Sequence, residues 1–174
     1  MQKFTELTKR NLKLYFREPG AIFFSLLTMM IVILLMVFFL GDMNVESITQ
    51  LLENYPGRDA DTDKKKAELL VFAWTCAGVL SINAVTVTLA AYSGMIKDRV
   101  SGLNAIYTSS ASQFTIATSY VAAAWVASVV VCLLTLLILE GIGVSRGMEW
   151  FSAGEHIKLL GMIGVNSFTY AAFM

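Results

Sequence analysis

Three uncharged, strongly apolar segments constrain the fold of this chain more than any other feature. They cover residues 21–40, 69–95 and 116–139, and a fourth apolar segment begins near Ile157 and runs to residue 174. A hydrocarbon core about 30 Å thick needs roughly 20 apolar residues in a helix. Every backbone amide within that core must be paired internally. The sequence therefore predicts an all-α, polytopic membrane bundle with three complete transmembrane helices and the start of a fourth.

The composition agrees with this prediction. Hydrophobic residues make up 56% of the 174 residues, and the charged 15% fall almost entirely outside the apolar segments. The aqueous segments are too short for an independent soluble core, so we expect a single membrane domain over residues 1–174. The chain stops inside an apolar run, where a free carboxylate would be costly. We therefore expect the domain to be incomplete, as the N-terminal part of a longer protein.

The leader ahead of the first apolar segment alternates basic and apolar residues at near-helical spacing. This pattern covers residues 3–17 and ends at Pro19-Gly20. It predicts a basic amphipathic helix that lies in the headgroup layer. A merely solvated leader is the alternative. The basic residues assigned to this interfacial helix are Lys9, Arg10, Lys13 and Arg17.

The orientation of the bundle depends on a small difference in basic residues. With a cytoplasmic N-terminus, the inside segments hold seven Lys and Arg residues and the outside loops hold six. The first span often dominates the orientation, and its leader carries five of the seven. We therefore expect a multi-pass protein whose N-terminus is cytoplasmic.

Two further loops carry structural signals. Apolar residues of the segment 41–55 recur at helical spacing and predict a short surface helix that stops at Pro56-Gly57, followed by an acidic linker. The loop from Glu140 to His156 contains four glycines and Trp150. It is typical of a turn-rich segment at the membrane interface.

Polar residues inside the apolar segments are few. Asn83 is the one carboxamide in a complete span, and Thr86 lies on the same face of that helix. Two roles are open for these side chains: they form packing hydrogen bonds between helices, or they line a substrate path. Ser119 and Ser128 belong to small-residue ladders, together with Ala123, Ala124 and Ala127, that allow another helix to approach closely.

Several kinds of chemistry lack their residues. No glycine is followed by lysine, so the chain has no P-loop. It also has no paired carboxylates in a span. The one histidine is in a loop, and Cys76 and Cys132 lie mid-span in different helices. We expect no catalytic residues, no metal site and no cofactor in this chain.

The segment 96–114, between the second and third spans, is the strongest candidate for a functional contact. It opens with alternating charge and continues with a glycine and apolar residues before a Ser/Thr cluster. A short helix along the cytoplasmic surface would present an apolar face outward, and a plain polar connector is the alternative. The residues assigned to this contact are Lys97, Asp98, Arg99, Gly102, Leu103 and Ile106.

Three stretches, residues 7–19, the first span and residues 97–120, resemble the membrane subunit of ATP-binding-cassette exporters of the type-2 permease family. That family opens with an interfacial connecting helix. After its second span it has a charged segment with a glycine-threonine pair and a Thr-Ser-Pro-like turn. Here Lys97-Asp98-Arg99 and Gly102-Leu103 stand in the charged and glycine positions, and Thr108-Ser109 in the turn. Leu103 replaces the threonine, and Ser110-Ala111 replaces the proline.

The resemblance implies that residues 96–114 are a coupling loop that contacts a separate ATPase subunit, which would hold ATP and Mg²⁺. It further implies that two six-span permease subunits, identical or different, pair in a bacterial inner membrane and export a hydrophobic or amphipathic solute. No nucleic-acid partner is expected. A membrane scaffold or immunity protein that binds a partner in the bilayer is the alternative function. A membrane-embedded enzyme is weaker, because no span offers an acid, a base, a nucleophile or a metal ligand set.

Overall fold

The protein is an all-helical bundle in the computed structural model, which describes residues 2–36, 41–53, 55, 57, 59–100, 111–147 and 152–174. Of these residues 93% are helical and none forms a strand. The predicted all-α class is confirmed. The helices are α1 (Gln2–Arg17), α2 (Pro19–Leu35), α3 (Gly41–Glu53), α4 (Ala60–Val100), α6 (Gln113–Ser145) and α7 (Ala153–Phe173).

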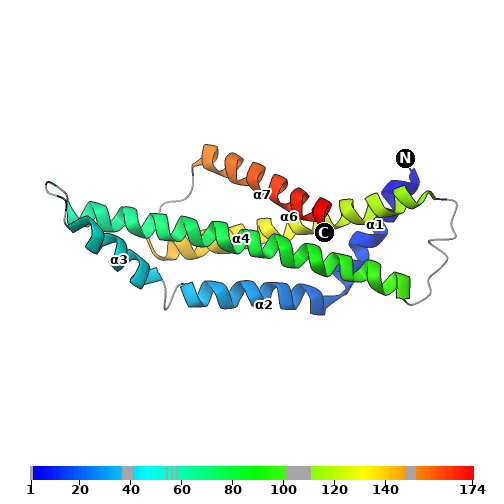
Figure 1. Ribbon diagram of the computed structural model, residues 1–174, viewed down its shortest axis with the longest axis horizontal. Helices are drawn as coiled ribbons and strands as arrows, with labels where there is room; N and C mark the ends of the chain where they lie inside the picture. Colours follow the sequence, from blue (N-terminus) through cyan, green and yellow to red (C-terminus); the bar gives the residue numbers. More distant parts are fainter. Residues whose placement is uncertain are drawn as a thin grey trace.

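The long helices α4 and α6 form the axis of the bundle and run antiparallel to each other (Figure 1). With 41 and 33 residues, each is long and apolar enough to cross a membrane. The helices α1 and α2 pass the same test only together, as one bent pair. The described residues thus support two spans, or three if the bent pair is one span. The predicted three complete spans and the start of a fourth go beyond this count.

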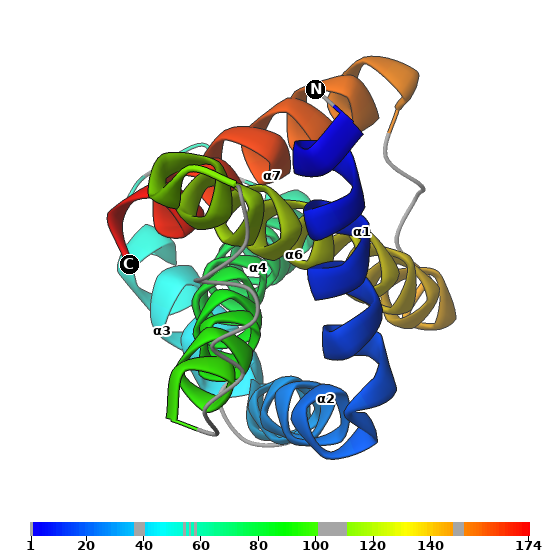
Figure 2. The same ribbon diagram turned by 90° about the vertical axis from the view of Figure 1, so that its right-hand side faces the viewer.

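The bend between α1 and α2 has a local cause at Pro19. Proline disfavours helical backbone at the residue before it and cannot donate an amide hydrogen bond. Accordingly Glu18 has φ −92° and ψ 86°, and Pro19 opens α2. The two helices meet at 66°. Figure 2 shows the result: α1 lies across one end of the bundle, at a large angle to α4 and α6.

The predicted acidic linker before the second span is wrong over residues 60–68, which form the first turns of α4. Asp59 caps the start of the helix, because its carboxylate accepts hydrogen bonds from the Asp61 and Thr62 amides and from the Thr62 hydroxyl, the last at 2.6 Å. Acidic residues in the first turn stabilise a helix, because they interact favourably with the positive end of its dipole. On the α3 side, Ala67 and Val71 pack against Val45, which gives this extension an apolar partner. At about 1.5 Å per residue, α4 is roughly 60 Å long and exceeds the hydrocarbon core.

The predicted loop from Glu140 to His156 is also shorter than expected. Helix α6 continues through Ser145, and the turn that follows contains Gly147 with φ +79°, a conformation that glycine adopts readily. Helix α7 begins at Ala153, four residues before the expected start at Ile157. Ser152 and Glu155 form a capping box there, which satisfies amides that the helix leaves unpaired.

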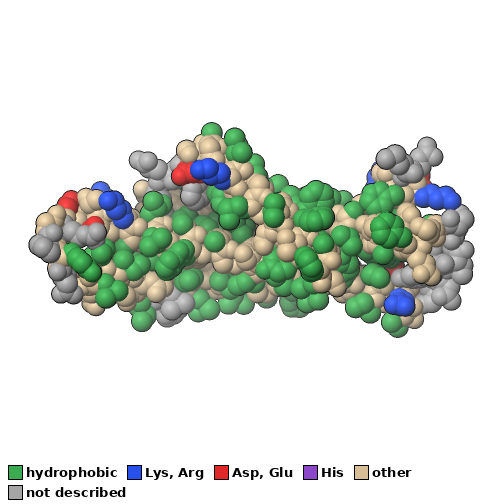
Figure 3. All heavy atoms as spheres, turned by 45° about the horizontal axis from the view of Figure 1, so that its top comes forward, with side chains coloured by type: hydrophobic (Ala, Val, Ile, Leu, Met, Phe, Trp, Pro, Cys, Tyr) green, Lys and Arg blue, Asp and Glu red, His purple; other side chains and the backbone are tan. Residues whose placement is uncertain are grey.

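Small side chains line the contact between α4 and α6, and large apolar side chains cover the outside. Ala84, Ala127 and Ser128 are fully buried in the contact. The outward faces expose large residues such as Trp74 and Leu137. Figure 3 shows hydrophobic atoms over the middle of the molecule and charged atoms mainly toward its two ends. An apolar band of this extent suits lipid contact.

Candidate functional site: buried carboxylates at the two ends of the bundle

Among the described residues, each end of the α4/α6 pair contains a buried carboxylate with a basic partner. At the α1 end we define the Asp98 site as Arg10, Asn11, Asp98, Ser119 and Tyr120. At the other end we define the Glu140 site as Glu140 and His156. Both carboxylates are nearly inaccessible, with residue exposures of 8% for Asp98 and 4% for Glu140. A buried charge is costly unless it is paired.

The Asp98 carboxylate joins three helices. Arg10 of α1 donates from Nη2 to Oδ2 of Asp98 at 2.9 Å. The Tyr120 hydroxyl of α6 donates to the same oxygen at 2.8 Å. Asp98 itself lies in the last turn of α4. The acidic residue predicted for an exposed contact therefore holds the leader helix to the ends of both long helices.

A second contact reinforces this connection. The Asn11 amide donates to the Ser119 hydroxyl at 3.2 Å, and Arg10 Nη1 donates to the Asn11 side-chain oxygen at 3.0 Å. Burial alone lowers the pKa of Arg10. The hydrogen bonds to Asp98 and Tyr120, with the charge of Asp98, outweigh that effect, so the pKa of Arg10 is raised. The cation at this site is permanent.

The other predicted contact residues fall into two groups. Lys97 and Arg99 are exposed on the last turn of α4, and Lys97 pairs with Glu18 at 2.6 Å. Residues 96–100 and 113–114 are helical, so the predicted loop 96–114 is shorter than expected. Gly102, Leu103 and Ile106, as well as Thr108-Ser109 of the resemblance, lie outside the described residues.

The four basic residues predicted for the interfacial helix also differ from one another. Lys9, Lys13 and Arg17 are exposed on α1, as a headgroup-facing surface requires. Arg10 instead points into the bundle toward Asp98. A cavity of about 330 Å³ lies beside it between α1, α4 and α6. Tyr15 lines this cavity, and its buried hydroxyl has no hydrogen-bond partner among the described residues.

The polar residues of the spans make contacts between helices. Asn83 is buried and its amide donates to the Thr135 hydroxyl of α6. Thr86 bonds carbonyl oxygens of its own helix. The cavity beside Asn83 and Thr86 measures only about 10 Å³, roughly one water molecule. Ser119 bonds Asn11, and the Ser128 hydroxyl donates to Ser167 of α7 at 3.0 Å.

The Glu140 site connects α6 to the start of α7. His156 Nε2 lies 2.6 Å from Glu140 Oε1, and the Glu140 side chain is 3% exposed. The two side chains are within ion-pair distance of each other. Their contact is not an aligned hydrogen bond: Oε1 of Glu140 has no hydrogen-bond partner among the described residues. The attraction between the two charges does not require this alignment, because it depends on distance more than on angle.

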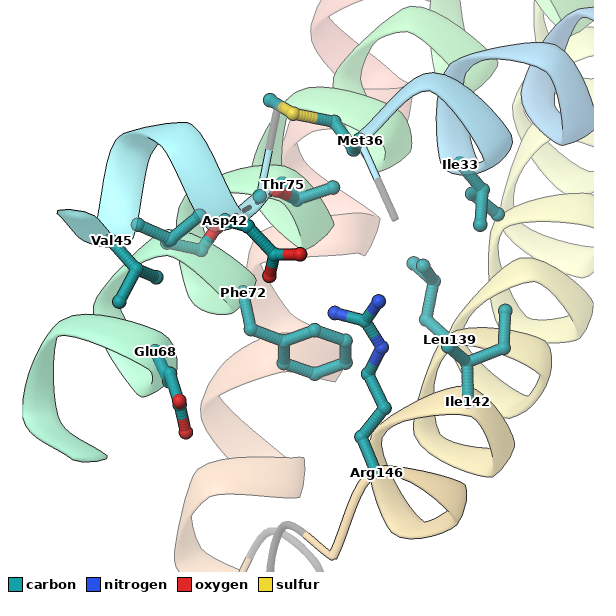
Figure 4. A pocket seen from close by; sticks show the side chains of 12 residues that line it. Ile33, Met36, Asp42, Val45, Glu68, Phe72, Thr75, Leu139, Ile142 and Arg146 are labelled. Carbon is teal, nitrogen blue, oxygen red and sulfur yellow. Dashed lines mark hydrogen bonds between the residues drawn. The ribbon is translucent and has the colours of Figure 1, made fainter. Parts of the chain in front are cut away.

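A cavity of about 260 Å³ opens on the other side of α6 at this end (Figure 4). Asp42 and Glu68 line it, and the Arg146 side chain points into it. Phe72 forms part of the wall and packs on Gly143, where an added Cβ would lie 3.0 Å from the ring. This close approach explains the glycine at that position.

An apolar groove of about 800 Å³ lies between α4, α6 and residues 158–169 of α7. Cys76 and Leu80 of α4 line one wall, Leu136 of α6 the floor, and Leu159 and Ile163 of α7 the other wall. The groove is large enough for part of an amphipathic molecule. It is the largest of the cavities between described residues that we identify.

Sequence reasoning did not identify Asn11, Tyr120, Glu140 or His156 as site residues. A signal for Glu140 was present: Cys132, Leu136, Leu139 and Gly143 continue one helical face past the expected end of the span, and Glu140 lies on it. No protein-family model, no curated protein and no solved structure matches the chain. The function must therefore be argued from the geometry.

Proposed function

We propose that this chain is the permease subunit of an ATP-driven exporter in a bacterial inner membrane, with a cytoplasmic N-terminus and a separate ATPase subunit as partner. The observation that carries the proposal is the Asp98 site. It ties α1 to the last turn of α4 and to the first turns of α6, the two helices that flank residues 101–112. Movement imposed on this segment would pass directly to the leader and to both long helices.

The mechanics of this arrangement fit a coupling role. A signal between two sites requires a rigid element that moves as a unit. The Arg10–Asp98 pair has a permanent cation, and the tyrosine and asparagine contacts fix its geometry. Arg99 and the predicted contact residues Leu103 and Ile106 follow immediately in the sequence. A partner that contacts this segment would therefore act on helices that the Asp98 site holds together rigidly.

The apolar groove supports a hydrophobic or amphipathic solute as the transported molecule. Its lining is mostly aliphatic, with polar groups such as Asn166 and Thr169 at intervals. The absence of a P-loop in the sequence agrees with ATP hydrolysis on another subunit. A second copy, or a related permease subunit, would complete the path.

The proposal is tested first by the location of the segment. Single cysteines at Arg99 and at Glu46, exposed at opposite ends, are treated with a membrane-impermeant maleimide in intact and permeabilised cells. We expect Arg99→Cys to react only after permeabilisation and Glu46→Cys to react in intact cells. Reaction of Arg99→Cys in intact cells rules out a cytoplasmic ATPase contact. The unsubstituted chain is the control, because Cys76 and Cys132 are buried.

The second test addresses the partner. A photo-crosslinking amino acid at Leu103 should capture a subunit that carries a P-loop, and the same group at Leu51, exposed on α3, should not. The double variant Arg99→Ala/Leu103→Ala should insert normally but lose the ATP-dependent crosslink. An unchanged crosslink, or stable complexes with a protein that has no nucleotide site, would favour the scaffold function instead.

A further inference from the structure

The Glu140 carboxylate lies beside a side chain that can neutralise it. Among the described residues, the ion pair that reaches Glu140 comes from His156. Neutral imidazole would leave a carboxylate uncompensated in the bundle, at a large cost. The buried position of Glu140 therefore favours a state in which the two side chains together hold one proton.

The orientation of the imidazole ring leads to the same conclusion. His156 Nδ1 lies 3.1 Å from the Ser152 carbonyl oxygen, which can only accept, so Nδ1 carries a hydrogen. Nε2 lies 2.6 Å from the Glu140 oxygen. If the carboxylate is ionised, Nε2 must carry a hydrogen as well and the ring is a cation. If Nε2 carries none, Glu140 must be protonated. Both arrangements contain the same single proton.

Other groups near the pair do not substitute for this proton. On α4 the Cys76 thiol lies within electrostatic reach of Glu140. On α7 Glu155 lies within electrostatic reach of both His156 and Lys158, which carries the opposite charge. On α6 the Arg146 side chain points into the separate cavity shown in Figure 4.

The pair lies where α7 departs from the rest of the bundle. The second half of α7 is held by several contacts: Trp125 donates to the Gly164 carbonyl at 3.0 Å, Ser128 bonds Ser167, and Tyr92 bonds the Ala171 carbonyl. In the first half Leu159 and Ile163 line the apolar groove and also pack against the core of the bundle. Between described residues, an ion pair from His156 to Glu140 attaches this half to α6.

We propose that Glu140 and His156 form a proton-binding site that holds the first half of α7 against α6, and that loss of the proton releases this half and widens the groove. The proton passes to water and leaves a carboxylate and a neutral ring. The Nε2 lone pair then faces an anionic oxygen, which is repulsive. The closed state is therefore favoured at low pH and lost as pH rises. This inference does not depend on the exporter proposal.

A distance measurement tests the inference directly. Spin labels are placed at Ile138 of α6 and Ile157 of α7, both exposed, with Cys76 and Cys132 replaced by alanine, and the full chain is reconstituted in lipid nanodiscs. Between pH 5 and pH 9 we expect a second, longer distance to gain population. Because one proton is released, the ratio of the long-distance to the short-distance population should rise by at most about tenfold per pH unit.

Matched variants separate the bridge from other titrations. The double variant Glu140→Gln/His156→Gln removes both charges and should show no pH response, whereas Lys158→Gln should keep the response. Distances that are the same at pH 5 and pH 9 in the parent chain, or an equal response in the double variant, would overturn the proposal.

A second measurement uses the chain with its native cysteines. Amide hydrogen exchange of residues 157–163, corrected for the intrinsic effect of pH, should accelerate at high pH relative to residues 165–172. Equal protection of the two halves of α7 at both pH values would contradict the release of the first half. Faster exchange confined to the first half would support it.

Discussion

The two buried carboxylates of this bundle differ in the permanence of their partners. Asp98 is paired with an arginine, which stays charged at any physiological pH, and Glu140 with a histidine, whose charge changes in that range. Tyr120, which bonds Asp98, and Glu140 are 20 residues apart on α6, or roughly 30 Å. That distance matches a hydrocarbon core, so the two pairs suit opposite membrane boundaries.

The Asp98 site also has more contacts than the Glu140 site. The Asp98 site combines an ion pair with hydrogen bonds from Tyr120 and Asn11, and it joins three helices. The Glu140 site connects two helices through one ionic contact without an aligned hydrogen bond. One end is therefore built to transmit movement as a rigid unit, and the other is suited to open and close.

The largest expected effect follows from the loss of Asp98. Asp98→Ala leaves Arg10 and Tyr120 without their acceptor and should lower the free energy of unfolding by about 2–4 kcal/mol. The value is below that of a fully buried pair because the Arg10 side chain is 34% exposed. Lys97→Ala, one residue away, removes an exposed pair and should cost under about 1 kcal/mol. Unfolding in mixed micelles measures both, and equal losses would refute the difference between the two contacts.

Close packing at the Glu140 end gives the next effect. Gly143→Val pushes a side chain into Phe72 and should destabilise the protein by about 1–3 kcal/mol. Gly94, near the Asp98 end, has open space around it, and Gly94→Val should change stability by less than about 0.5 kcal/mol. The same unfolding assay compares them. A neutral Gly143→Val would mean that Phe72 can move away into the adjacent cavity.

An exchange of partners tests whether the type of cation decides pH sensitivity. Arg10→His places a titratable ring beside Asp98. The ring gains a proton more readily when paired, so its stabilisation should be present at low pH and fall as pH rises, by at most about 1.4 kcal/mol per pH unit. Arg10→Lys keeps a fixed charge as the control. Unfolding between pH 5 and pH 8 should separate the two variants, and parallel profiles would show that the contact geometry matters more than titration.

The sequence predicts the helical class and both long helices, because apolar length and the absence of charge are local properties. For the same reason it places Glu140 and the segment 60–68 in loops, because a charged residue at the end of an apolar segment predicts the end of the transmembrane helix. Their burial or helicity depends on partners far away in the sequence, His156 for Glu140 and Val45 for Ala67.

The same limitation applies to the Asp98 site. Alternating charge in Lys97-Asp98-Arg99 predicts a solvated surface, and only the last turn of α4 shows which of the three residues faces inward. Arg10 likewise belongs to a basic face on spacing alone, yet it is 88 residues from the carboxylate that it pairs with. Contacts over such separations leave no periodic signal in a single sequence.

The smallest predicted effect concerns the Glu140 end of the bundle. Two neighbouring residues there, Glu155 and His156, should stabilise α7 in opposite pH ranges. Hydrogen bonds from the Ser152 backbone and hydroxyl lower the pKa of exposed Glu155. The stabilisation that this cap gives to α7 is present above the ordinary pKa and is lost as pH falls through the lowered value. The His156 bridge, by contrast, should weaken as pH rises. Hydrogen exchange of residues 153–158 should therefore be slowest at intermediate pH. Glu155→Gln keeps an oxygen acceptor for the Ser152 amide but has no titratable group, so it should remove the acid limb and leave the alkaline limb in place. Loss of both limbs in this variant would mean that the cap and the bridge act as one unit rather than as two opposing contacts.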